Sequence, residues 1–353
     1  MYFFRSDYLK IVFIDAFPVL SYLLSRIWES ISDFYGRRKP FIILGYMLGS
    51  LSLALAGFAQ NMDTLIALIL VMNFFYSIDF PALYATLGYY GGREIYGLVE
   101  AVNSLGWMIG ATLLGYIHLY GGQLAIYITG SFLIFLFLLI ILFLREPSRK
   151  ETEFSFLKHV ESSLKLKLRA KSLFKYLLAS SFIAWIATLW NSALLKVKLY
   201  LLVGESLEYC GLTMGLGAGL LSIIASFIAT VLSKRYGGVP ILTLSLLLYS
   251  VSTPLLALTQ STFIYITFYI LPVWSFFYIG QLAAAYELSE SGFEAENIGT
   301  LTTIAGLSSL PALVGGVIAD LHGINIAILS ASLLYLSALL ALILAKSKLL
   351  YGS

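Results

Sequence analysis

The chain has 353 residues, of which 59% are hydrophobic and 12% are charged, and its formal net charge is +3. A soluble domain carries about 25% charged residues, so this composition excludes a chain that folds in water and indicates a membrane protein. The only cysteine is Cys210, which excludes a disulfide framework and a cysteine-rich metal site. The cations form no basic soluble face, so we expect no nucleic-acid partner, and we expect neither a metal nor a cofactor.

Eleven apolar segments are long enough to cross a bilayer, which takes about 20 residues. In chain order they are residues 11–32, 41–59, 64–88, 97–118, 123–144, 176–198, 209–232, 239–258, 262–286, 297–319 and 324–345. Lipid offers no hydrogen-bond partners to backbone groups, and the alternation typical of barrel strands is absent, so all eleven are predicted to be helices. The predicted fold class is therefore an all-α polytopic membrane protein.

A short basic turn, Ser32-Asp33-Phe34-Tyr35-Gly36-Arg37-Arg38-Lys39-Pro40, joins the first two spans. Gly36 permits a sharp turn, and Pro40 suits the first turn of a helix. A weaker copy, Ser233-Lys234-Arg235-Tyr236-Gly237, follows 201 residues later, and at the same offset Gly115 pairs with Gly316. The repeat predicts two related halves, an arrangement found in transporters.

The third span carries an aspartate, Asp79, near its middle. An ionisable residue inside a membrane span is costly and marks a functional site by default. Pro81 deprives the carbonyl of Ser77 of its usual partner, and Asn73 and Tyr76 add to a polar turn, so we expect a hydrated, irregular stretch facing a cavity. We expect Asp79 to bind a cationic substrate or to carry a coupling proton. The alternative is a structural aspartate bonded to a neighbouring helix.

The one long polar stretch, residues 145–175, holds nine cations and four glutamates. Its apolar residues recur at helical spacing, which fits an amphipathic helix on an anionic membrane surface; a solvated tether is the alternative. Placing this stretch and the basic turn on one side gathers seventeen of the 22 Lys and Arg residues there. The bias predicts that the central loop and the C-terminus are cytoplasmic. The predicted domains are 1–144, a linker over 145–175, and 176–353.

Two spans of the second half place aromatic and polar residues on one face. In span 176–198 these are Trp185, Thr188 and Ser192, with Asn191 beside them. In span 262–286 they are Trp274, Tyr278 and Gln281. Rings with a few polar groups suit a small organic ligand, and helix packing is the alternative for each face.

Three charged residues lie near the outer ends of their spans. Asp15 is within reach of water there and is a minor site candidate. Lys196 and Lys198 either attract anions or extend their ammonium groups to the membrane surface.

The basic turn, the spans and the repeat together resemble the major facilitator superfamily. The family signature reads Gly-x-x-x-Asp-Arg-x-Gly-Arg-Arg/Lys; Asp33, Gly36, Arg37 and Arg38 match it, whereas Glu29 and Phe34 depart from it. The signature follows the first span, which therefore corresponds to the family's second helix in a two-bundle fold of five and six helices. A helix is expected ahead of residue 1, and either a misplaced start or lost segment, or a true truncation, explains its absence.

The resemblance also implies an inner gate at the basic turn. It places Asp33 near the start of the helix around Asn297–Gly299, where the helix dipole favours a carboxylate. Arg37 and Arg38 are expected to pair with the acidic loop that holds Glu287, Glu290, Glu294 and Glu296. The alternative is that these cations only set the topology.

The function that the resemblance implies is secondary active transport of a small solute across the cytoplasmic membrane by a monomer whose two bundles rock about a central site. No Walker-type loop is present, so ATP is not the direct energy source. Protons are the first hypothesis for a coupling ion, and facilitated diffusion is the second. An enzyme is not expected, and the alternative is a non-transporting membrane solute sensor or a truncated transporter remnant.

Overall fold

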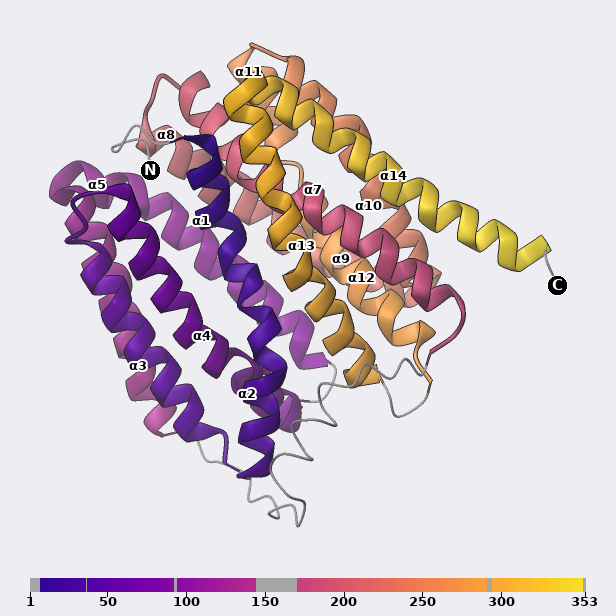
Figure 1. Cartoon of the computed structure of the whole chain (residues 1–353), viewed down its shortest axis with the longest axis horizontal. Coiled ribbons are helices and arrows are strands. Elements are labelled where there is room, and N and C mark those ends of the chain that lie inside the picture. Colours follow the sequence, from indigo (N-terminus) through magenta and orange to yellow (C-terminus); the bar gives the residue numbers. More distant parts are fainter. Residues whose placement is uncertain (1–6, 36, 92–93, 144–169, 291–293, 352–353) are drawn as a thin grey trace. The chain divides into compact units, whose positions relative to one another are not determined.

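The computed structural model describes residues 7–35, 37–91, 94–143, 170–290 and 294–351 as helices joined by short turns (Figure 1). The helices are α1 (Tyr8–Leu20), α2 (Tyr22–Phe34), α3 (Lys39–Ala56), α4 (Met62–Gly91), α5 (Glu94–Leu142), α7 (Leu173–Leu202), α8 (Leu207–Leu212), the π-helix η2 (Thr213–Gly219), α9 (Leu220–Tyr236), α10 (Gly238–Leu258), α11 (Thr262–Tyr269), α12 (Val273–Leu288), α13 (Glu294–His322) and α14 (Ile324–Tyr351). Within these ranges the only β pairing is an isolated bridge between Ala170 and Ser289. The predicted all-helical class is confirmed.

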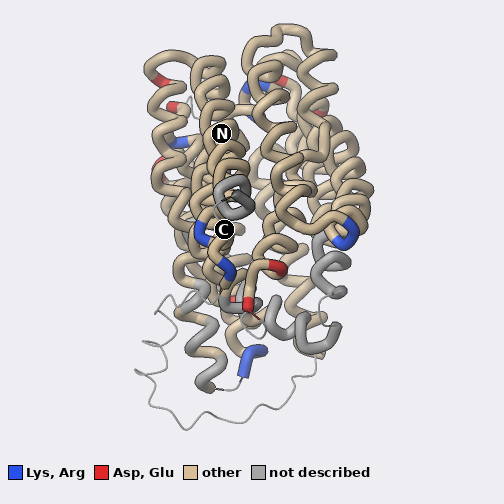
Figure 2. Tube along the Cα trace, turned by 90° about the vertical axis from the view of Figure 1, so that its right-hand side faces the viewer, with Lys and Arg blue, Asp and Glu red and all other residues tan. Residues whose placement is uncertain are grey.

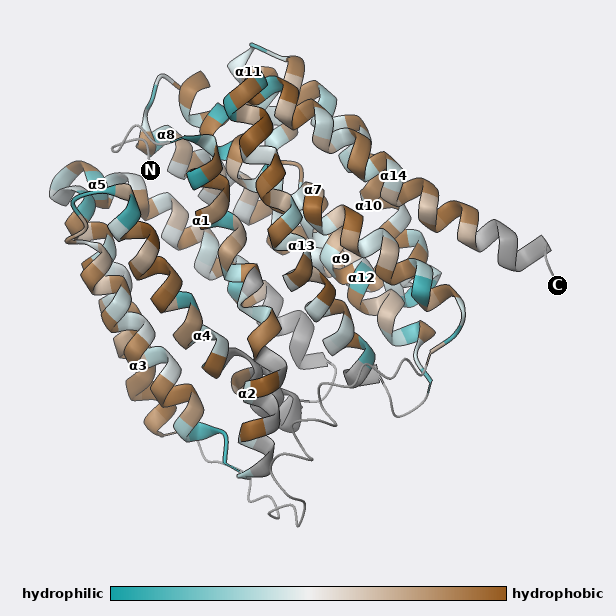
Figure 3. Cartoon of the chain, in the orientation of Figure 1, coloured by the Kyte–Doolittle hydropathy of each residue, from teal (hydrophilic) through white to brown (hydrophobic). Residues whose placement is uncertain are grey.

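Nine helical stretches of the described residues are long and apolar enough to cross a membrane. One of them, residues 101–142, is 42 residues long and covers most of two predicted spans, 97–118 and 123–144. The backbone breaks between those two at Gly122, whose φ of 65° and ψ of −164° are not helical. Figure 3 shows apolar residues along most of the helices, and Figure 2 shows that charged residues occupy little of the described trace.

The first predicted span, residues 11–32, is two helices rather than one. α1 and α2 have 13 residues each and meet at Ser21. Pro18 lies inside α1 and cannot donate a backbone N–H, while the Ser21 hydroxyl donates to the Pro18 carbonyl at 2.5 Å. Pro18 thus removes one helix bond within the turn before the break, and each piece is too short to span a bilayer alone.

The described helices fall into two compact units. Of the described residues, unit 1 holds 17–35, 37–91, 94–96 and 117–143, and unit 2 holds 7–16, 97–116, 170–290 and 294–351. Residues 7–16 and 97–116 precede the linker in the chain but make their contacts in unit 2. The domain boundaries drawn from the sequence, at 144 and 176, stay a prediction.

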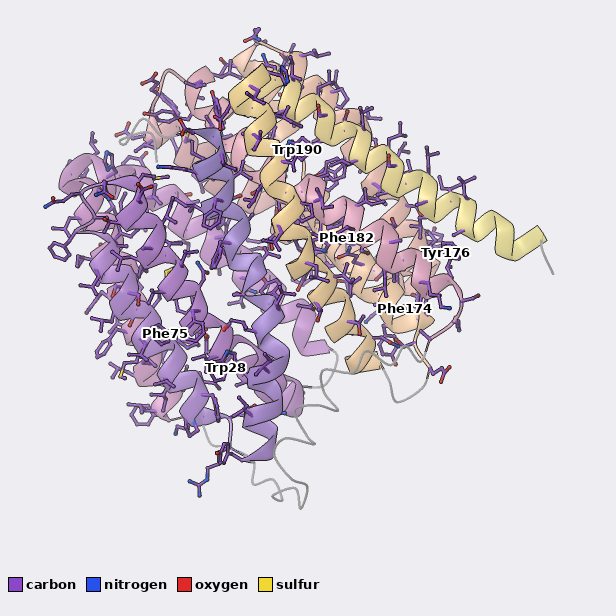
Figure 4. The ribbon with its side chains drawn as sticks, in the orientation of Figure 1. Trp28, Phe75, Phe174, Tyr176, Phe182 and Trp190 are labelled. Carbon is purple, nitrogen blue, oxygen red and sulfur yellow. The ribbon has the colours of Figure 1, made fainter. Side chains whose placement is uncertain are left out.

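In unit 1, glycine lets α3 and α4 approach closely. A Cβ at Gly45 would lie 2.7 Å from the Asp79 Cβ and 2.8 Å from the Phe75 carbonyl oxygen, and a Cβ at Gly49 would overlap the Tyr76 ring. A third helix, α2, also contacts α4. The indole of Trp28 on α2, labelled in Figure 4, donates to the Ser77 hydroxyl of α4 at 3.1 Å. Small residues at a helix interface are the usual basis of packing in lipid.

In unit 2, α7 is the most enclosed helix. Its Ser180 hydroxyl donates to the Ala338 carbonyl of α14 at 2.8 Å. The indole of Trp190, which is labelled in Figure 4, donates to the Ala327 carbonyl of α14 at 2.9 Å. On α13, the Ser308 hydroxyl donates to the Phe182 carbonyl at 3.1 Å. α7 is therefore tied to both α13 and α14 by side chains that bond to backbone.

Candidate functional site

Of the polar residues predicted on α4, Asn73, Ser77 and Asp79 are buried in unit 1, and Tyr76 is partly buried. The Asn73 amide donates to the Ile69 carbonyl at 2.8 Å, and the Ser77 hydroxyl donates to the Phe74 carbonyl at 2.6 Å. Both bonds satisfy side chains within the helix itself. The bonds within α4 therefore satisfy the Asn73 amide N–H and the Ser77 hydroxyl, and Ser77 also accepts from the Trp28 indole.

Asp79 is only 4% exposed, and its Cβ lies against Gly45 of α3. The expected irregular stretch is not found, because α4 continues as a helix through residues 80–91. Tyr76, one turn before Asp79, has a buried hydroxyl with no hydrogen-bond partner among the described residues. The α4 site is thus a carboxylate and a phenol enclosed between closely packed helices.

In unit 2 the structure brings the predicted residues of α12 together with Trp185 of α7. The Trp185 indole donates to the Gln281 Oε1 at 3.1 Å. Its ring meets the Trp274 ring edge-on, with centroids 5.5 Å apart, and Trp274 in turn stacks on Tyr278 at 5.6 Å. Two helices therefore contribute to one group of rings and amides.

The bond from Trp185 fixes the orientation of the Gln281 amide. An indole nitrogen only donates, so the acceptor must be Oε1, which leaves Nε2 on the other side. Gln281 is 1% exposed, and Nε2 has no hydrogen-bond partner in the described residues. A buried donor left without a partner costs about 1–3 kcal/mol.

Thr188 and Asn191 face a different neighbour, which the sequence did not predict. The Tyr335 hydroxyl of α14 donates to the Thr188 hydroxyl at 3.1 Å. The Asn191 amide lies beside the same phenol, but neither of its polar atoms meets hydrogen-bond geometry. Tyr335 stacks on Tyr249 at 4.6 Å, and Tyr249 meets Phe277 at 6.0 Å.

These contacts join six of the seven residues predicted on these two faces into one cluster, and Ser192 is not part of it. We call it the aromatic–amide cluster; it consists of Trp185, Thr188, Asn191, Tyr249, Trp274, Phe277, Tyr278, Gln281 and Tyr335. It contains no acid, lysine or arginine. Tyr249, Phe277 and Tyr335 gave no signal in the sequence, because the chain has 24 tyrosines and 24 phenylalanines and only the fold shows which of them meet.

Asp15 and Lys196 form an ion pair that the sequence did not predict. The Lys196 Nζ donates to the Asp15 Oδ1 at 2.6 Å, which joins α7 to α1 inside unit 2. Lys198 is buried, and its ammonium donates to the Ala257 carbonyl at 2.6 Å and to the Asn325 Oδ1 at 2.8 Å. The expectation that Lys198 extends to the membrane surface is wrong, because these two acceptors hold it inside unit 2.

Part of the predicted inner gate lies outside what the structure describes. Gly36 and the side chain of Asp33 are outside the described residues, Arg37 is exposed, and Arg38 is buried. In the acidic loop, both carboxylate oxygens of Glu287 accept from the Gly238 backbone N–H at 2.9 Å. Glu287 thus caps the start of α10, and the gate itself stays a prediction.

No group of three or more His, Cys, Asp or Glu residues in the described ranges could hold a metal ion. The chemistry that the aromatic–amide cluster can offer is stacking and neutral hydrogen bonding. The α4 site can offer a carboxylate.

The comparisons with known proteins agree with this architecture. The model of the Major Facilitator Superfamily matches residues 12–309. No curated protein matches the chain.

Among solved structures, a mutant of the nucleoside transporter NupG has a TM-score of 0.77 at 12% identity, covering 97% of this chain and 92% of that one. A bacterial homologue of the human lysosomal transporter Spinster has a TM-score of 0.75 at 14% identity, covering 98% and 90%. The human organic anion transporter MFSD10 has a TM-score of 0.65 at 18% identity, covering 94% and 83%. These likenesses show a shared fold, and the family match shows that the chain belongs to the major facilitator superfamily.

Proposed function

We propose that the chain is a secondary active transporter that moves a small, uncharged solute across the cytoplasmic membrane by alternating access. The family and the multi-pass helices imply a small-molecule substrate and a membrane environment. The solute, the coupling ion and the mechanism are the proposed part.

The Gln281 amide is the observation that carries the choice of site. Trp185 holds it in one orientation, and its Nε2 keeps two N–H donors without a partner in the described residues. An arrangement of this kind suits a ligand that supplies a carbonyl, hydroxyl or ring-nitrogen acceptor. The half-buried rings of Trp274 and Tyr278 lie on the same face of α12 as Gln281 and supply a stacking surface.

The lack of charge in the aromatic–amide cluster favours an uncharged solute. An ionic ligand buried there would lose its hydration without gaining an opposite charge. A neutral ring compound, by contrast, meets aromatic faces and amide donors. The structural neighbours named for transport of nucleosides and of organic anions therefore suggest a screen that contains both classes, in which we expect the nucleosides to be favoured.

Asp79 is the proposed carrier of a coupling proton. It is a buried carboxylate on a membrane helix, and such groups often serve proton relays. The competing proposal is that Asp79 only joins α4 to its neighbours, and facilitated diffusion is then the mode of transport.

Uptake into proteoliposomes tests the proposal. The wild-type chain should accumulate at least one neutral solute, and Gln281→Leu should reduce that uptake while leaving the protein folded. A matched control is Ser337→Ala, which removes an exposed hydroxyl of α14 that donates to the Leu333 carbonyl of its own helix. A solute that stabilises the protein against heat but is not taken up would favour a sensor instead.

A further inference from the structure

The first turn of α1 is bound by the last turn of α13. Asp320 accepts from the Tyr8 N–H at 2.7 Å with Oδ1 and from the Leu9 N–H at 3.1 Å with Oδ2. The first N–H groups of a helix have no partner within the helix, and the positive end of the helix dipole favours a carboxylate there. Asp320 thus caps a helix that lies more than three hundred residues away in the chain.

Glycine brings the two backbones together at this point. A Cβ at Gly316, one turn before Asp320, would lie 2.5 Å from the Leu9 Cα and 2.9 Å from its nitrogen. A Cβ at the preceding Gly315 would overlap the Trp190 ring of α7. Only glycine therefore fits at either position, and α13 contacts both α1 and α7 through adjacent residues.

The Asp15–Lys196 ion pair holds α1 a second time, two turns further along. The Lys196 and Asp15 side chains are 31% and 20% exposed, so water screens the pair only in part. The stretch 7–16 is therefore fixed at one end by α13 and at the other by α7. This accounts for its place in unit 2, whereas residues 17–34 belong to unit 1.

These contacts lie at the start of the segment that the sequence predicts to cross the membrane over residues 11–32, and the basic turn follows the end of that segment, so we expect the contacts at the membrane end opposite the turn. α1 starts at Tyr8 and continues through Ser21 into α2, which ends at Phe34, next to the turn. A release of residues 7–16 from α13 and α7 can therefore be absorbed at the break around Pro18 and Ser21. Pro18 cannot donate a helix bond to the Ile14 carbonyl, and proline is a usual cause of a helix kink, so this break can serve as a hinge.

We propose that Asp320 and the Asp15–Lys196 pair form a latch that closes the membrane end opposite the basic turn, and that the latch must release for a solute to enter or leave there. This inference rests on the proposed alternating access.

The latch can be tested without a substrate, by the rate at which a buried cysteine is labelled. The chain offers a clean background, since Cys210→Ser removes its only cysteine. Ala16→Cys then places a single thiol at a buried position on α1. A membrane-impermeant maleimide is added to right-side-out and to inside-out vesicles.

We expect slow labelling in this background and labelling about fivefold to tenfold faster after Asp320→Ala, the size of effect that loss of a helix cap produces. Gly316→Ala should act in the same way, because the new Cβ meets backbone. The matched control is Gly110→Ala, where a Cβ meets nothing within 4 Å, and its labelling should stay at the background rate.

The ion pair gives a second arm that does not depend on Asp320. Lys196→Gln should speed labelling, and the exchange Asp15→Lys with Lys196→Asp should slow it again. The latch is overturned if Asp320→Ala, Gly316→Ala and Lys196→Gln all label at the background rate while each elutes as a folded protein. Because no solute enters this test, a failure of the latch and a failure of transport are separate results.

Discussion

Unit 1 and unit 2 bury their polar residues in different ways. On α4, Asp79 is enclosed because glycines on α3 allow two helices to approach closely. In the aromatic–amide cluster, Trp185 and Gln281 are buried, and the bond between them satisfies the indole N–H and the amide oxygen. A polar residue in an apolar span can therefore be accommodated in two ways. The α4 site depends on the space that glycine leaves between helices, and the aromatic–amide cluster depends on hydrogen bonds between side chains.

The largest expected effect is the loss of stability when a side chain is added at a glycine that packs against the α4 site. We expect Gly45→Leu to abolish folded protein. Its Cβ would lie 2.7 Å from the Asp79 Cβ and 2.8 Å from the Phe75 carbonyl oxygen, and a leucine adds three more carbons to a contact in which overpacking costs about 1–3 kcal/mol or more. Thermal unfolding in detergent measures this. Gly110→Leu is the control, since that position has open space, and an equal loss of stability in both variants would contradict the packing account.

The next effect concerns the charge of unit 1. For one proton per solute, a pH gradient of about one unit drives at most about tenfold accumulation, since each 1.4 kcal/mol is tenfold. We expect Asp79→Asn to reduce that accumulation to about onefold while exchange of solute across the membrane continues. If accumulation persists in Asp79→Asn, Asp79 is a structural residue and the coupling group lies elsewhere.

A smaller effect is expected in the aromatic–amide cluster. Trp185→Phe keeps a ring beside Trp274 but removes the N–H that holds Gln281. The Gln281 Oε1 would then be a buried acceptor without its donor, and the amide would no longer be held in one orientation. We expect the apparent affinity for the solute to fall about tenfold, on the scale of 1–3 kcal/mol. Concentration-dependent uptake measures it, and an unchanged affinity would remove Gln281 from the site.

The smallest effect should come from Tyr335→Phe. The Thr188 hydroxyl loses the bond from Tyr335 but still donates to the Ala184 carbonyl at 2.8 Å. We expect about 1 kcal/mol of lost stability and a solute affinity within about twofold of wild type. A large loss of affinity with normal stability would instead place Tyr335 in direct contact with the solute.

The fold was largely predictable from the sequence, and the contacts of the site were predictable only in part. The lengths of the apolar segments predict membrane-spanning helices, because backbone groups in lipid must find their hydrogen-bond partners within the segment itself. The basic turn marks where one span ends and the next begins. Helical spacing correctly placed Trp274, Tyr278 and Gln281 on one face. It could not show that Trp185 bonds to Gln281 or that Thr188 meets Tyr335, because periodicity describes one helix and these contacts join two.

The ends of the spans were predicted least well. The sequence predicts a membrane-surface position for Asp15, Lys196 and Lys198. In the structure Asp15 pairs with Lys196, and Lys198 is buried and donates to two acceptors. Asp320 gave no signal because its partners are backbone N–H groups, which every sequence has. The break at Ser21 had a visible cause in Pro18, but a single proline inside a span does not tell whether the helix bends or ends.

The most direct test of the transport proposal is uptake of a radiolabelled neutral solute by proteoliposomes, with a nucleoside as the first choice, compared between wild type, Gln281→Leu and Ser337→Ala. The account predicts saturable uptake by wild type and Ser337→Ala and about tenfold weaker uptake by Gln281→Leu. A solute that binds the purified protein but is never taken up by wild-type vesicles would contradict it.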